Sequence, residues 1–445
     1  MKKTSLKIYQ CISPALNILY GLLCLIAGLT LIFCPVTITK PLSGLIAIIL
    51  MVIYGIKSFL KCKDEGRIKE AFTTLIVCLL IAAALYLFLN FFIELLYIVL
   101  IVVSLVLFIL RIVIGVYMIS CKVPGFVKNM IFGLIYLVFT IMLIAYKGDS
   151  KIAFVFFVLG IYLILAFISA MGDFIAFKRG SDLDEKNTKR RFHLGLPNIV
   201  SATETKRLIE TCNEYVKAHE NETSITVQKE GTDKYDVNFE ILIHASRIKA
   251  PGKSFGHADI AIGDTIYTYG CYDRTTYKLG NFMAGGNFVI VPKEAYIKEC
   301  LTTQEKYIVA YGCHLSQTQM EAVKNRITEI LQDTKKMNPS TFDKEAHKDD
   351  GVTVYTNIGG TAYEVIRGPF KTYFAIESNC AKLADTIAGA AGLDAMANGS
   401  FPTPGALFAL INDMFIRANT RVIRRTVYLQ SEPGAIKKQQ VSKAK

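Results

Sequence analysis

Residues 256–270 read GHADIAIGDTIYTYG, and this stretch decides the fold of the C-terminal half of the chain. Apolar side chains recur at every second position from Ala258 to Ile262, which is the period of a β-strand. A turn at Gly263 to Thr265 then leads into a second run, so the stretch predicts an antiparallel hairpin. His257, Asp259 and Ala261 would share one strand face, and we expect the opposite, apolar face to lie in the core and the polar face to point outward.

Similar signals extend over residues 201–432 and predict an α+β domain with a central antiparallel sheet. Ser316 to Gln319 has the form of a capping box, which predicts a helix from there to about Asp333. The other expected helices are 201–220 and 379–391, and the other expected strands are 236–243, 287–291, 352–355, 363–366 and 421–429.

Residues 1–178 form a near-continuous series of apolar runs. Each run approaches the ~20 residues that a helix needs to cross a bilayer core. We therefore expect a six-helix transmembrane domain, with spans near 13–34, 41–60, 71–89, 92–119, 125–146 and 152–177. The basic start of the chain is not followed by a small-residue cleavage site, which argues against a removed signal peptide.

The net charge of +13 does not indicate a nucleic-acid partner, because most of the excess lies in the apolar half. Residues 1–180 carry 16 Lys and Arg against 6 Asp and Glu, which leaves +10 there. The basic residues gather at the N-terminus, in the second and fourth loops and after the last span. By the positive-inside rule, this alternation predicts a multi-pass cell-membrane protein with both termini in the cytoplasm.

Glycines recur along the spans as if three pairs of helices were repeated, most clearly at Gly21 and Gly28 and at Gly133 and Gly160. Small residues allow helices to approach closely within a membrane. Gly-rich paired spans of this kind resemble the six-helix HdeD-type membrane proteins. The charged residues Glu94 and Arg111 are expected to lie near span ends and to snorkel, which favours an anchor or lipid-interacting scaffold over a pump.

Two segments between and after these domains are polar and basic: residues 179–200, a juxtamembrane linker, and residues 433–445, a disordered tail. The 11 cysteines are scattered and form no Cys-x-x-Cys pair, as in a reducing compartment. Cys271, Cys300 and the Cys313-His314 pair have spacings that fit no common zinc site. The sequence therefore predicts neither a metal nor a cofactor.

One cysteine stands at a helix start. Ser378 and Asn379 are good N-caps, and Cys380 follows them at the head of an apolar helical stripe. A helix N-terminus and a nearby imidazole both favour the thiolate, so Cys380 is a candidate nucleophile with His257 as its base. Ser378 and Asn379 would then lie at the substrate or oxyanion position. The alternative interpretation of Cys380 is a small buried apolar residue.

His257, the Gly263-Asp264 turn and the Asn379-Cys380 pair together resemble the circularly permuted papain-like fold of NlpC-type hydrolases and lecithin:retinol acyltransferase-like enzymes. The resemblance implies that Cys380 is the nucleophile and that His257 is the base. The family has a polar third residue about twelve positions after its histidine, where this chain has Tyr269. Tyr269 would face His257 only if the turn has three residues; with two it would face the core, and Asp259 is the alternative partner.

These features predict a membrane-anchored cysteine hydrolase or acyltransferase whose cytosolic domain forms an acyl-enzyme. The bilayer would be its first partner, and its substrate would be a lipid, an acylated protein or a peptide. The alternative is an inactive sensor or binding module of the same fold, tethered to a membrane scaffold.

Overall fold

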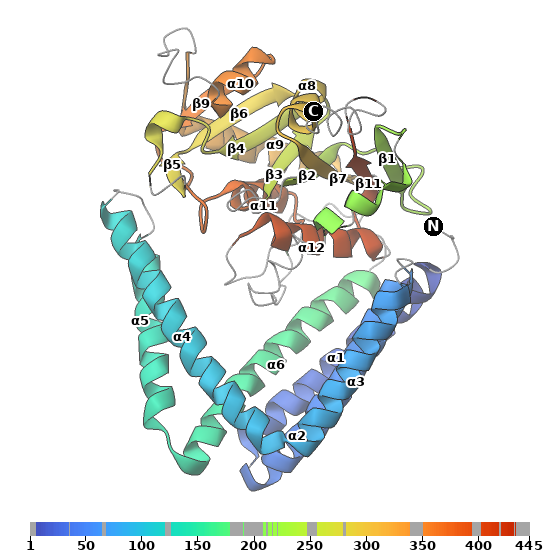
Figure 1. Ribbon diagram of the computed structural model, residues 1–445, viewed down its shortest axis with the longest axis vertical. Helices are drawn as coiled ribbons and strands as arrows, with labels where there is room; N and C mark the ends of the chain where they lie inside the picture. Colours follow the sequence, from blue (N-terminus) through green and yellow to red (C-terminus); the bar gives the residue numbers. More distant parts are fainter. Residues whose placement is uncertain are drawn as a thin grey trace, which may run out of the picture. The chain divides into compact units, whose positions relative to one another are not determined.

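The computed structural model describes residues 6–34, 36–64, 68–120, 126–178, 190, 208–210, 212–215, 217–219, 221–246, 256–278, 282–338, 350–393, 402–417, 420–430 and 432. The chain divides into two compact units, Met1–Arg179 and Gly180–Lys445 (Figure 1). The linker expected at 179–200, apart from Arg190, and the tail at 433–445 lie outside the described residues. The helix expected at 201–220 is described only in part, and residues 208–210 and 212–215 are helical.

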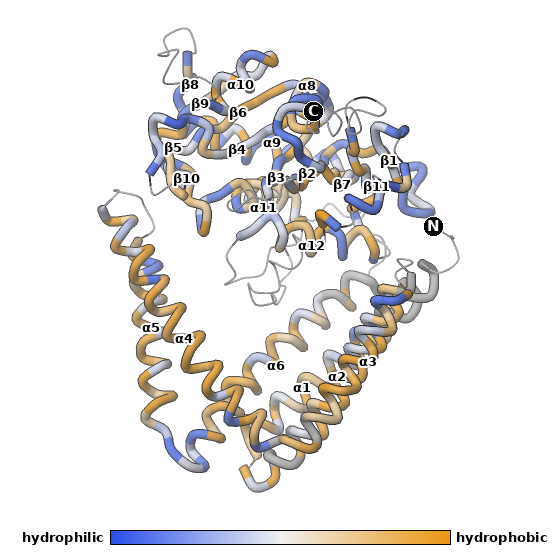
Figure 2. The backbone as a smooth tube through the Cα atoms, viewed as in Figure 1, coloured by the Kyte–Doolittle hydropathy of each residue, from blue (hydrophilic) through white to orange (hydrophobic). Residues whose placement is uncertain are grey.

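Apart from short connections, the described part of the first unit is helical, and its helices are mostly apolar (Figure 2). They are α1 (Leu6–Phe33), α2 (Val36–Asp64), α3 (Ile68–Leu87), α4 (Leu89–Ser120), α5 (Phe126–Ala145) and α6 (Gly148–Lys178). Four of them, α1, α4, α5 and α6, contain stretches long and apolar enough to cross a bilayer. The apolar stretch of α2, Gly44–Leu60, is shorter. The structure thus indicates a membrane protein with four candidate spans among the described residues, where six were expected.

The helices of this unit pack most extensively as α1 with α6, α2 with α3 and α4 with α5. The sequence suggested three pairs of consecutive helices, but in the structure the first helix packs most extensively against the last. A Cβ atom on Gly28 of α1 would lie 2.8 Å from the carbonyl oxygen of Gly160 on α6, and one on Gly21 would lie 3.0 Å from Ala170. The close contact of α1 and α6 therefore depends on small residues, as helix packing in a membrane generally does.

Arg111 does not snorkel to a helix end as its position suggested. Arg111 is 9% exposed, and its Nη1 donates a hydrogen bond to Asn129 Oδ1 at 2.7 Å, which links α4 to α5. Glu94, in contrast, is exposed and pairs with Lys151. A buried cation is costly without a polar partner, so Asn129 makes the position of Arg111 tolerable.

Among the residues that the structure describes, the second unit is built on a nine-stranded sheet in which every neighbouring pair is antiparallel, as predicted. The strand order is β1-β11-β7-β2-β3-β4-β6-β9-β8. The strands are β1 (Ser224–Gln228), β2 (Phe239–Ser246), β3 (His257–Ile262), β4 (Thr265–Gly270), β6 (Asn287–Pro292), β7 (Lys306–Cys313), β8 (Thr334–Lys336), β9 (Thr361–Val365) and β11 (Val422–Tyr428). Two shorter strands, β5 (Met283–Gly285) and β10 (Thr372–Phe374), form a separate antiparallel pair.

Helices cover both faces of the sheet, which corrects the expectation that one face points outward. One apolar core joins the sheet to α9 (Gln317–Gln332), α11 (Cys380–Ala390) and α12 (Pro404–Ile416). A second core joins the opposite face to α8 (Lys293–Thr302) and α10 (Gly351–Asn357). The polar face of β3 is therefore enclosed, and Asp259 on it is 1% exposed.

The segment 352–355, expected as a strand, lies within α10. Asp350 caps this helix, and its side chain accepts a hydrogen bond from the Thr353 N–H at 2.8 Å. The period-two pattern of Val352 and Val354 is thus overridden by a local cap and by packing of Val352 and Tyr355 into the second core.

Candidate active site

The helix that carries Cys380 begins where the sequence predicted. Asn379 has extended backbone angles, and its Oδ1 accepts a hydrogen bond from the Lys382 N–H at 3.0 Å. Asn379 Nδ2 donates to the carbonyls of Ala375 and Pro402 at 2.8 and 2.6 Å, and Ser378 Oγ donates to Thr372 O at 2.7 Å. Both side chains are therefore engaged with the backbone. The structure gives Ser378 and Asn379 a role in holding the entry to α11, in place of the substrate or oxyanion contact expected for them.

The structure brings Cys380 and His257 together, although 123 positions separate them in the chain. α11 packs against β3, and this places the Cys380 thiol within electrostatic reach of the His257 imidazole. The backbone N–H of Ala258 and the Tyr373 side chain on β10 also act on the sulfur. Cys380 is 2% exposed, so its sulfur lies in an enclosed polar setting inside an apolar core.

Asp259, rather than Tyr269, is the partner of the imidazole. The β3–β4 register pairs Ile262 with Thr265, so the turn has only two residues, Gly263 and Asp264. Tyr269 consequently faces the core, where its hydroxyl donates to Phe370 O at 2.8 Å. Asp259 Oδ1 lies 3.0 Å from His257 Nε2.

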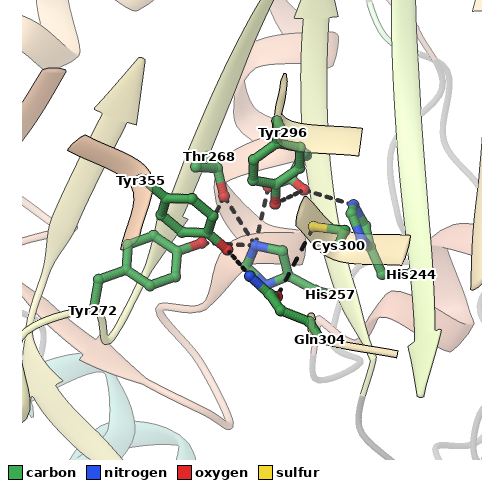
Figure 3. Close-up of polar contacts among 9 residues, drawn as sticks. His244, His257, Thr268, Tyr272, Tyr296, Cys300, Gln304 and Tyr355 are labelled. Atoms are coloured by element: carbon green, nitrogen blue, oxygen red, sulfur yellow. Dashed lines mark hydrogen bonds and ion pairs between the residues drawn. The ribbon is translucent and has the colours of Figure 1, made fainter. Parts of the chain in front are cut away.

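Two hydroxyl groups share the same nitrogen of His257 (Figure 3). Thr268 Oγ1 lies 3.0 Å and Tyr272 Oη lies 2.9 Å from Nε2, and the two oxygens are 2.6 Å apart. With a carboxylate and two hydroxyls gathered at Nε2, the nitrogen that remains for the thiol is Nδ1. The ring is thereby held between the sulfur and a set of oxygens.

The second oxygen of Asp259 contacts two further side chains from neighbouring elements. His244 Nε2, on β2, lies 2.7 Å from Oδ2, and the Tyr296 hydroxyl, on α8, donates to the same oxygen at 2.7 Å. His244, Asp259 and Tyr296 are each at most 1% exposed. The carboxylate is therefore surrounded by neutral or cationic donors in a dry environment.

The charges of Cys380, His257 and Asp259 shift the pKa of each of these groups so that its ionised form is favoured. Burial alone would lower the pKa of His257, but the Asp259 carboxylate and the Cys380 thiolate raise it to about 10. Burial opposes ionisation of Cys380 as well, yet the His257 charge, its hydrogen bond and the Ala258 N–H bring the pKa of the thiol below its usual value. The two imidazoles likewise outweigh burial at Asp259 and hold its pKa well below the usual range. The favoured state is a thiolate, an imidazolium and a carboxylate.

Other buried cysteines of this unit behave in the opposite way. Burial raises the pKa of Cys212, Cys300 and Cys313 to about 12 each, so these thiols stay protonated. Reactivity requires the thiolate, which sets Cys380 apart from them.

Sequence reasoning missed His244, Thr268, Tyr272, Tyr296 and Tyr373. A two-residue turn would have identified Thr268, because it places that residue opposite Asp259. The remaining four depend on strand order and on helix packing that no local pattern specifies.

No cluster of three or more His, Cys, Asp or Glu side chains suited to a metal ion occurs within the part of the chain that the structure describes. Comparison of the chain with protein-family models, curated proteins and solved structures finds no match.

Proposed function

We propose that this protein is a membrane-anchored cysteine hydrolase or acyltransferase whose nucleophile is Cys380. The observation that carries the proposal is the grouping of Cys380, His257 and Asp259: a thiol at a helix N-terminus, an imidazole that interacts with it electrostatically, and a carboxylate 3.0 Å from Nε2 of that imidazole. A nucleophile, a base and a group that orients the base are the three parts of covalent acyl transfer.

In the proposed reaction the Cys380 thiolate attacks the carbonyl carbon of an amide, ester or thioester. The C–S bond forms, and the tetrahedral intermediate collapses as His257 gives its proton to the leaving amine, alcohol or thiol. Water or an acceptor alcohol or amine then attacks the thioester while His257 takes a proton from it. Cys380 leaves as the thiolate, so the enzyme returns to its starting state.

Donors for the developing oxyanion are present at the start of α11. The first N–H groups of a helix have no acceptor within that helix, and the Asn379 side chain satisfies that of Lys382. The N–H groups of Cys380 and Ala381 are then the available donors for an oxyanion. Their position at the positive end of the helix dipole also favours the thiolate.

The substrate class follows from the membrane unit. An enzyme anchored by apolar helices meets lipids, acylated proteins and membrane-associated peptides at high local concentration. If both termini are cytoplasmic, as the charge pattern predicts, these substrates are preferred over cell-wall peptides. The permuted papain-like fold is supported by the same features: a strand that begins at His257, a two-residue turn and a later helix that begins at Cys380.

The test is labelling of the full-length protein in detergent with a thiol-directed acyl probe. We expect labelling of the wild type and its loss in Cys380→Ala, with a retained unfolding transition. Cys300→Ala is the matched control, because its thiol is buried and protonated, and it should keep full labelling. Equal labelling of the wild type and Cys380→Ala would refute the assignment.

One observation favours the alternative of a non-catalytic binding module. Cys380 is 2% exposed, and the Tyr373 side chain contacts its sulfur. Under this alternative, an acyl probe would leave Cys380 of the folded wild type unlabelled, and the thiol would react only after unfolding.

A further inference from the structure

The polar cluster behind His257 contains a second histidine that the proposed reaction does not use. His244 stands directly opposite His257 in the β2–β3 ladder and is 1% exposed. Figure 3 shows its ring on the far side of the cluster from Tyr272, beside Tyr296. Burying a titratable ring costs free energy unless the ring has a partner, so the position of His244 calls for a physical explanation.

We propose that His244 and Tyr296 are positioning residues that fix the Asp259 carboxylate, and through it the proton affinity of His257. This inference rests on the proposed function and adds to it a layer of residues that never touch the substrate. It is based on the different contacts of the two carboxylate oxygens. His244 Nε2 and the Tyr296 hydroxyl each lie 2.7 Å from Oδ2, whereas His257 Nε2 lies 3.0 Å from Oδ1.

The two contacts on Oδ2 leave the carboxylate little freedom to rotate. The Tyr296 hydroxyl donates a hydrogen bond to Oδ2, and His244 Nε2 makes a close polar contact with the same oxygen. Tyr296 is itself fixed by ring contacts with His244 at 5.8 Å and with Tyr355 at 5.2 Å between centroids. A carboxylate held on one oxygen from two elements presents the other oxygen to His257 in one orientation.

His244 and Tyr296 are both uncharged, and this preserves the negative charge of Asp259. Burial lowers the pKa of His244 to about 4, and Lys306 and His257 add to this effect while Asp259 opposes it. His244 Nδ1 has no hydrogen-bond partner among the described residues, so a second ring proton would have no acceptor there. A lysine or arginine at this place would cancel the charge of Asp259, whereas a neutral imidazole and a phenol stabilise the carboxylate and leave its full charge for His257.

The structure also explains why a tyrosine can accompany the histidine without competing for the proton. Burial, followed by the Asp259 and Cys300 charges, raises the pKa of Tyr296 well above its usual value. The phenol therefore keeps its proton, and remains a donor, well above the pH at which an ordinary tyrosine ionises. The groups that face His244 are then Asp259 and His257 from β3, Tyr296 from α8 and Lys306 from β7.

The experiment measures the pH dependence of iodoacetamide alkylation at Cys380, followed by peptide mass spectrometry of the full-length protein. His244→Leu removes the donor, and we expect the alkylation midpoint to rise by about one pH unit, a tenfold loss of thiolate relative to thiol at a given pH. His244→Gln keeps an N–H donor and should restore at least half of the shift. Tyr296→Phe removes only a hydroxyl and should move the midpoint in the same direction.

Tyr296→Phe carries the test if His244→Leu does not fold, since it preserves the packing of the ring. Folded variants whose alkylation profiles superimpose on a low wild-type midpoint would overturn this inference and leave the proposed function standing. A wild-type midpoint near that of an ordinary thiol, ~8.5, would overturn both.

Discussion

His244 and His257 face each other across the β2–β3 ladder with ring centroids 5.6 Å apart, and both contact the single carboxylate of Asp259. Their proton affinities nevertheless diverge, with a pKa of about 4 for His244 and about 10 for His257. The difference arises because His257 also faces the Cys380 thiolate, whereas His244 faces Lys306. One buried anion is thus shared by a neutral and a cationic imidazole.

Replacing Asp259 by Asn should weaken the ion pair at the thiol. With the carboxylate charge gone, burial lowers the pKa of His257, and Cys380 loses part of the cation that favours its thiolate. We expect the midpoint of Cys380 alkylation to rise by at least one pH unit, about 1.4 kcal/mol. Asp264→Asn, in the exposed turn, is the control and should leave the profile unchanged.

The thiolate–imidazolium pair should stabilise the fold over a limited pH range. The raised pKa of His257 gives stability that is complete below 6.5 and is lost as pH rises toward about 10. The lowered pKa of Cys380 gives stability that is complete above 9.0 and is lost as pH falls through its folded value. Together they predict a plateau between about pH 6.5 and 9, with a decline on either side.

This pH dependence can be measured as the difference in unfolding midpoint between the wild type and the Cys380→Ala/His257→Gln double variant. The difference should be greatest within the plateau. A difference that stays constant from pH 5 to 10 would contradict the ion pair.

Tyr269→Phe should affect stability without affecting the thiol. The variant loses the hydrogen bond from the buried hydroxyl to Phe370 O, worth about 1 kcal/mol, and leaves that carbonyl unsatisfied. The alkylation profile of Cys380 should remain that of the wild type, because Tyr269 is neutral and makes no described contact with His257. A shift as large as that of Asp259→Asn would return Tyr269 to the role of third catalytic residue.

Gly28→Ala should destabilise the membrane unit. The added methyl group would lie 2.8 Å from the carbonyl oxygen of Gly160 and 2.9 Å from Ile164, so α1 and α6 would have to separate. Gly172→Ala on α6 is the matched control, because nothing lies within 4 Å of its Cβ position. Thermal unfolding in detergent should show a lower midpoint for the first variant and an unchanged midpoint for the second.

The strands and helices with strong local signals were predictable from the sequence. The alternation at β3, the two residues that cap α11 and the capping box before α9 each act within a few positions of the chain, and each structural element begins close to where these signals placed it. β7 and α8 were missed. β7 is buried on both faces and therefore shows no polar alternation, and α8 has no side-chain cap hydrogen bond.

The residues of the candidate site were predictable only where the neighbouring sequence indicated the role of a residue. Cys380 and His257 could be paired because a helix start and a strand start both have local signatures. The partner of His257 could not be chosen, because it depended on the length of one turn. His244 and Tyr296 could not be predicted from the sequence, because their proximity to Asp259 follows from the order of strands and from the packing of α8 on the sheet.

The length of the turn at Gly263 and Asp264 therefore decides which face of the sheet each side chain of β4 occupies. If the turn kept two residues, one inserted residue would shift the register of β4 and rotate every later side chain of that strand to the opposite face, exchanging Thr268 and Tyr269. A phenol would then stand beside His257 and a threonine would enter the core, although neither residue had been mutated. An insertion or deletion at this exposed loop could thus change the chemistry of the site more than any single substitution within it.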